Sequence, residues 1–92
     1  MEINFINLKE QIKKGEIETA IKQLNLYIQS NPQCTDEAFY LLGNAYRKQG
    51  NWQMALNNYL EAIERNPQSP AVNAQKMLMD ILEFYNKDMY NQ

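Results

Sequence analysis

An internal duplication constrains the fold of this chain more than any other feature of its sequence. Three landmark residues of the first half return at one offset of 35 residues: Gly15 as Gly50, Ala20 as Ala55 and Pro32 as Pro67. A repeat of this length is typical of proteins that stack similar supersecondary units. The 92 residues have room for two such units, at about 2–33 and 36–69, within one small domain.

Each unit has the pattern of two helices joined by a tight turn. The first helix of the second unit has apolar residues at helical spacing: Phe39, Leu42, Ala45 and Tyr46. The second helix has the stripe Trp52, Ala55, Leu56, Tyr59, Ala62 and Ile63, in which Trp52 is expected to fill the core. Gly50 lies where a left-handed residue would end the first helix, and proline in Asn66-Pro67 ends the second.

The first unit and the end of the chain repeat this pattern more loosely. The apolar residues of the first unit are Phe5, Leu8 and Ile12, then Ile17, Ala20, Ile21, Leu24 and Ile28. Ser69-Pro70 opens a terminal helix over about 70–86, whose apolar places are Ala74, Met77, Leu78 and Ile81, and a short tail follows at 87–92. Because no segment alternates with the period of a strand, the sequence predicts an all-α fold of five helices.

The second unit resembles a tetratricopeptide repeat, a helix–turn–helix unit of about 34 residues. The residues that carry the resemblance are Phe39, Leu42, Gly43, Tyr46, Ala55, Tyr59, Ala62 and Pro67. Gly43 and Ala55 are small where the two helices would cross closely. The first unit departs from the pattern, since its Leu-Gly pair is replaced by Asn7-Leu8 or Leu8-Lys9. The resemblance implies an α-solenoid in which each unit contacts its neighbours, and a non-catalytic protein-interaction module.

The resemblance also implies a concave face, lined by the first helix of each unit, that binds an extended peptide or protein segment. The candidate groove residues are Lys9, Lys13, Tyr40, Asn44, Arg47 and Lys48. Asn44 would hydrogen-bond a ligand backbone and Arg47 would hold a carboxylate, so an acidic partner is expected. An alternative explanation of the cations is that they lie in the last turn of a helix, where the macrodipole favours them whatever the function.

The terminal helix provides a second candidate surface, because its apolar residues spread over more than one face. The candidate self-association residues are Met77, Met79, Phe84, Met89 and Tyr90. They favour a homodimer or structural homo-oligomer as the alternative function. In a third possibility, the tail residues Met89 and Tyr90 fold back and cover the patch.

Composition argues against several other classes of function. Nine Lys and Arg against eleven Asp and Glu give a net charge of −2, whereas nucleic-acid binders normally carry a clustered basic excess. Histidine is absent and Cys34 is the sole cysteine, so we expect no enzyme activity, no metal and no cofactor. No signal peptide or membrane span is apparent, which predicts a cytoplasmic protein without membrane contact.

Overall fold

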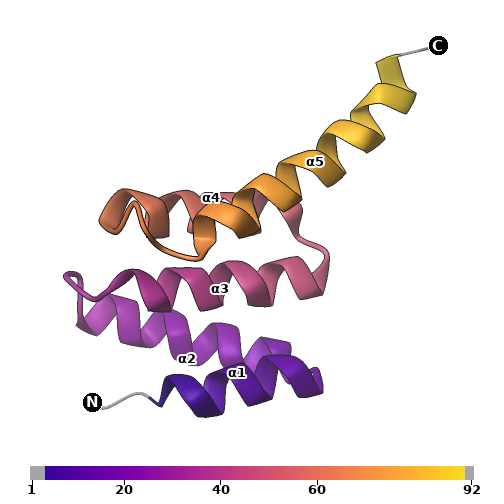
Figure 1. Cartoon of the computed structure of the whole chain (residues 1–92). Coiled ribbons are helices and arrows are strands. Elements are labelled where there is room, and N and C mark those ends of the chain that lie inside the picture. The colour runs from indigo at the N-terminus through magenta and orange to yellow at the C-terminus, as the bar shows by residue number, and fades with distance from the viewer. Residues whose placement is uncertain (1–3, 91–92) are drawn as a thin grey trace.

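The structure is a stack of helices, and the computed structural model describes the backbone of residues 4–90 and the side chains of residues 4–83. Five helices follow one another along the chain: α1 (Phe5–Lys14), α2 (Ile17–Ser30), α3 (Asp36–Gln49), α4 (Trp52–Arg65) and α5 (Ala71–Tyr90) (Figure 1). Residues 4–90 contain no strand. The predicted all-α fold of five helices is therefore confirmed.

Glycine ends the first helix of each unit. Gly15 and Gly50 follow α1 and α3 and have φ angles of 94° and 88°, in the left-handed region that glycine adopts without a steric penalty. The Gly50 N–H donates to the carbonyls of Arg47 and Tyr46, which would otherwise lack a partner at the helix end. The turn predicted at Gly50 is confirmed, and both turns reverse the chain so that the paired helices run antiparallel.

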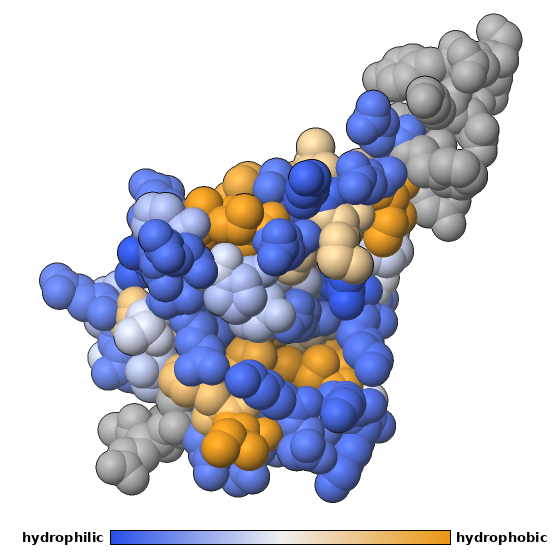
Figure 2. All heavy atoms as spheres, viewed as in Figure 1, coloured by the Kyte–Doolittle hydropathy of each residue, from blue (hydrophilic) through white to orange (hydrophobic). Residues whose placement is uncertain are grey.

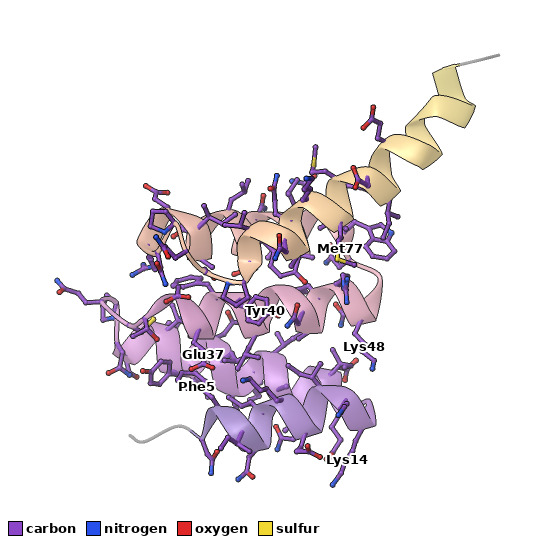
Figure 3. The ribbon with its side chains drawn as sticks, in the orientation of Figure 1. Phe5, Lys14, Glu37, Tyr40, Lys48 and Met77 are labelled. Atoms are coloured by element: carbon purple, nitrogen blue, oxygen red, sulfur yellow. The ribbon has the colours of Figure 1, made fainter. Side chains whose placement is uncertain are left out.

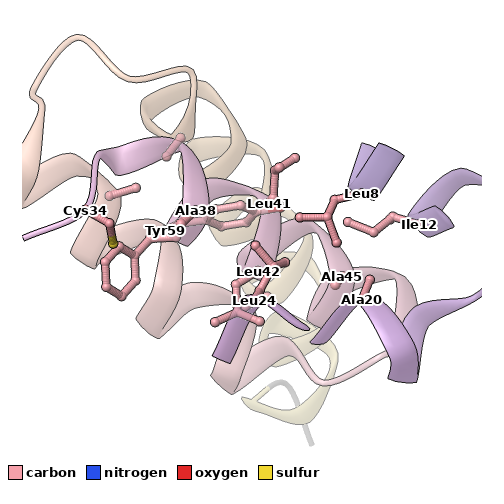
Figure 4. Packing of buried hydrophobic residues seen from close by; sticks show 14 of the residues in the cluster. Leu8, Ile12, Ala20, Leu24, Cys34, Ala38, Leu41, Leu42, Ala45 and Tyr59 are labelled. Atoms are coloured by element: carbon pink, nitrogen blue, oxygen red, sulfur yellow. The ribbon is translucent and has the colours of Figure 1, made fainter. Parts of the chain in front are cut away.

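The core follows the predicted apolar stripes, and α3 lies at its centre. This helix packs against α1, α2 and α4, and it buries Ala38, Phe39, Leu41, Leu42, Gly43 and Ala45. The first unit contributes Leu8, Ile12, Ala20 and Leu24 to the same cluster (Figure 4). Apolar burial of this kind is the main favourable term in folding, so α3 connects the two units energetically.

Gly43 of α3 lies directly against the ring of Tyr59 of α4. The Tyr59 side chain is fully buried, and a methyl group at position 43 would lie 2.5 Å from its Cδ1 and Cε1 atoms. Only a residue without a side chain allows this crossing. In the first unit Leu8 occupies the place of Gly43, and α1 contacts α2 less extensively than α3 contacts α4.

Arg65 at the end of α4 fastens the turn that joins the two units. Its guanidinium lies 4.4 Å from the centroid of the Phe39 ring, and its Nη1 donates to the Cys34 carbonyl at 3.3 Å. The Asn66 amide donates to Asp36 at 3.4 Å. These contacts hold the beginning of α3 against the end of α4, and Cys34 is buried beside them.

Three details of the sequence-based prediction are wrong. Helix α5 continues to Tyr90 instead of ending near residue 86, because Asn86-Lys87-Asp88 contains neither proline nor glycine to stop it. Trp52 is 37% exposed, since it is the first residue of α4, at the edge of the stack. Met77 occupies no core position and is 57% exposed, because α5 turns Leu78 toward α4 instead.

Within the described part of the chain, no helix combines the length and apolarity that a membrane span requires.

We expect Gly43→Ala to destabilise the protein although alanine is the better helix former. The added methyl group forces the buried Tyr59 ring or the α3–α4 crossing to shift, which should lower the free energy of unfolding by about 1–3 kcal/mol. Urea unfolding followed by circular dichroism measures this change. Gln49→Ala, at an exposed position of the same helix, should change stability by less than about 0.5 kcal/mol. Equal effects of the two substitutions would contradict the tight crossing.

Candidate binding groove

A hollow of about 560 Å³ lies between α1 and α3. These two helices run in the same direction, so their C-terminal ends come together, with Lys14 and Lys48 at the same edge (Figure 3). The residues that line the hollow are Lys9, Glu10, Ile12, Lys13, Leu41, Asn44, Arg47 and Lys48. We call it the basic hollow, because four of these residues are cations and one is a carboxylate.

The basic hollow combines an apolar floor with polar walls. Ile12 of α1 and Leu41 of α3 are both buried in the core cluster and form the floor. Apolar surface is visible between α1 and α3, with hydrophilic residues around it (Figure 2). Such a surface suits a ligand segment that carries apolar side chains among acidic ones.

The structure brings together five of the six predicted groove residues. Lys9, Lys13, Asn44, Arg47 and Lys48 line the basic hollow. Tyr40 lines a neighbouring hollow of about 370 Å³ at the N-terminal end of α3, together with Lys9, Thr35, Asp36, Glu37 and Pro70. Lys9 belongs to both hollows, so they adjoin each other along the face formed by α1 and α3.

Two carboxylates modify the charge of this face. The Lys9 Nζ lies 3.5 Å from Glu37 Oε2, in a solvent-exposed ion pair that connects α1 to α3. Solvent-exposed ion pairs contribute little to stability. This pair nevertheless neutralises part of the Lys9 charge. Glu10 lines the basic hollow and was missed by the sequence analysis. Its spacing of three residues from Lys13 places both on one helix face, which is the signal that would have identified it.

Asn44 is held by a residue from the other helix of its unit. The Tyr59 hydroxyl donates to Asn44 Oδ1 at 2.5 Å, and the ring that carries this hydroxyl passes beneath Gly43. The Tyr40 ring packs against the Tyr59 ring with centroids 6.2 Å apart. Because the Asn44 oxygen accepts from Tyr59, the amide nitrogen of Asn44 is left as its hydrogen-bond donor.

The environment of Tyr59 perturbs its acidity. The pKa of Tyr59 is raised to about 12, because burial disfavours the charged phenolate. The Arg47 cation opposes this rise, and neighbouring Tyr40 adds to it. Tyr59 therefore stays protonated and keeps donating to Asn44 over the whole neutral range.

Three of the four cations of the basic hollow also fit the alternative explanation from helix electrostatics, the exception being Lys9. Lys13 and Lys14 lie in the last turn of α1, and Arg47 and Lys48 lie in the last turn of α3. There they interact favourably with the negative ends of the two macrodipoles. Since α1 and α3 are parallel, the same preference places the cations at one edge of the groove.

The predicted self-association residues can be located only in part. Met77 and Met79 of α5 are 57% and 42% exposed. The side chains of Phe84, Met89 and Tyr90 lie outside the described residues. The expected tail at Met89 and Tyr90 belongs to α5 itself, so the idea that it folds back over the patch is wrong.

The described part of the chain has no cluster of metal-binding side chains. Among these side chains, no three His, Cys, Asp or Glu residues gather as a metal site would require. Cys34 is buried in the turn before α3 and lines neither of the two hollows described above.

Comparison with known proteins identifies the repeat. The family model described as tetratricopeptide repeat matches residues 36–69. Residues 36–69 are a repeat of the tetratricopeptide family. It is also similar to the solution NMR structure of a Bacteroides fragilis protein, with 58% identity and a TM-score of 0.85 over 99% of this chain and 92% of that one. No curated protein sequence matches it significantly. Tetratricopeptide repeats are typically non-catalytic protein-interaction modules, and this is the class of function that the family indicates.

The raised pKa of Tyr59 predicts a loss of stability at alkaline pH. An unfolded tyrosine has a pKa of about 10, so between about pH 10 and about pH 12 the folded state holds a proton that the unfolded state releases. The Tyr59 contribution to the free energy of unfolding is complete below pH 10 and falls through this window. Urea unfolding at about pH 9 and about pH 11 should show a larger decline for the wild type than for Tyr59→Phe. Equal declines would contradict the burial of this hydroxyl.

Proposed function

We propose that this tetratricopeptide repeat protein binds an acidic segment of a partner protein in the basic hollow. The observation that carries the proposal is the convergence of Lys13, Asn44, Arg47 and Lys48 around a floor of Ile12 and Leu41. Side chains that are distant in the sequence form one surface there, through the parallel packing of α1 and α3. This surface offers positive charge, a fixed amide and apolar contact to the same ligand.

Each lining group has a chemically distinct task in this proposal. Arg47 forms paired hydrogen bonds with a ligand carboxylate, for which its planar guanidinium is suited. Lys13 and Lys48 supply further positive charge from opposite walls. Asn44 donates from its amide nitrogen to a main-chain carbonyl, because its oxygen is held by Tyr59. Leu41 and Ile12 receive an apolar side chain of the bound segment.

The proposal predicts that reversing the charge of Arg47 abolishes most of the binding. A suitable probe is a fluorescein-labelled octapeptide of alternating Leu and Glu with a free C-terminal carboxylate, measured by fluorescence anisotropy. Arg47→Glu should weaken its binding by at least about tenfold, since it removes a charge-assisted contact and adds a repulsive one. The free energy of unfolding should fall by no more than about 1–2 kcal/mol, because the side chain reaches the surface and the main loss is its attraction to the negative end of the α3 macrodipole.

Two controls make this test specific. Lys22→Glu makes the same charge change at an exposed position of α2 outside the basic hollow and should leave binding nearly unchanged. A peptide with Lys in place of Glu and an amidated C-terminus should not bind the wild type. If Arg47→Glu and Lys22→Glu weaken binding equally, only net charge matters and the groove assignment is wrong.

The proposed binding should also depend on salt. The cations of the basic hollow reach solvent, so mobile ions screen their attraction for a carboxylate. We expect the dissociation constant for the Leu–Glu peptide to rise several-fold between about 0.05 M and about 0.5 M NaCl. Anisotropy titrations at the two salt concentrations measure this. An unchanged constant would mean that apolar contact alone holds the peptide.

A further inference from the structure

Helix α5 has a face that no other helix covers among the described residues. Four residues along this face are exposed, with spacings of four, three and four that place them on one stripe: Val72, Lys76, Met79 and Glu83. We call them the outer stripe. The opposite side of α5 packs against α4 and buries Ala71 and Leu78.

The outer stripe corresponds to the face by which α3 packs on α4. Aligning the inward-facing residues of the two helices matches Ala38, Leu41 and Ala45 of α3 with Ala71, Ala74 and Leu78 of α5. In the same register, Phe39, Gly43 and Tyr46 of α3 match Val72, Lys76 and Met79 of α5. Because Gly43 faces Tyr59 of α4, the outer stripe occupies a position where a helix docks in the preceding unit.

The chemistry of the outer stripe restricts what can dock there. Lys76 stands where α3 has glycine, so an occupant cannot approach α5 as closely as α4 approaches α3. It must also place an acid near the Lys76 ammonium and a cation near Glu83, while it covers Val72 and Met79. A second helix α5 has these groups at the required spacing.

We propose that two copies of this chain associate by antiparallel pairing of their outer stripes. With the two-fold axis between Met79 and Asp80, Lys76 of each copy lies opposite Glu83 of the other, while the two Lys76 residues are about 10 Å apart along the helix axis. The two Met79 side chains then lie beside each other at the axis. A parallel pair would instead place Lys76 against Lys76, which is repulsive.

The position of α5 in the fold supports a second copy as the occupant. The C-terminal half of this helix extends past α1–α4 (Figure 1). A helical segment of this length is marginal in water unless another surface packs against it. Two antiparallel α5 helices give each other this support.

A charge-swap experiment tests the pairing with the full-length chain. Multi-angle light scattering after size-exclusion chromatography, with the protein loaded at about 1 mM, measures the mass of the wild type, Lys76→Glu, Glu83→Lys and the double swap. We expect the wild type to rise from 10.9 kDa toward twice that mass. Each single swap should return the mass toward the monomer, because equal charges then face each other. The double swap should restore association, and Lys22→Glu should behave as the wild type.

Three outcomes would overturn the proposal. A wild type that stays monomeric shows that no second copy docks, which leaves the outer stripe to another protein. A dimer that neither single swap weakens associates through another surface. A double swap that stays monomeric, while circular dichroism shows unchanged helix content, excludes the Lys76–Glu83 pairing.

Discussion

The contact between the Tyr59 ring and the backbone of Gly43 is the constraint on which the rest of the structure depends. It sets how closely α3 and α4 cross, and α3 is the helix on which α1 and α2 also pack. The same tyrosine then extends beyond the crossing and donates to Asn44 on the groove side of α3. One buried side chain thus joins the packing of the repeat to the surface proposed to bind a ligand. A substitution at either residue would disturb stability and the groove together.

Much of the fold follows from the repeat pattern, because the features that specify it are local. Gly50 ends α3 through its own backbone conformation, and Asn66-Pro67 stops α4 through the steric demand of proline. Tyr59 and Leu24 are buried as their spacing predicts. The predicted C-terminal end of α5 is wrong because no residue near position 86 prevents helix formation, and a polar composition alone does not end a helix.

The candidate site was less accessible to sequence reasoning, since it depends on which neighbour covers each residue. Trp52 has the spacing of a core residue but lies at the first position of α4, where the stack ends, so a third of its surface meets solvent. The Lys9–Glu37 pair becomes visible only when α1 and α3 are placed side by side. The face of a helix can be predicted from its period, whereas contacts between helices require the register between them.

Because each helix packs mainly on its neighbours in the stack, the two units differ in how easily they open. The extensive contacts of α1 and α2 are with each other and with α3, and α1 contacts α2 less extensively than α3 contacts α4. The first unit can therefore open while α3 and α4 stay together, so amide hydrogens of α1 would exchange faster than those of α3. One wall of the basic hollow belongs to that more labile unit. A ligand that contacts both walls would slow this opening. Its affinity would be lower than its contacts alone would give, because binding would restrict the motion of the first unit.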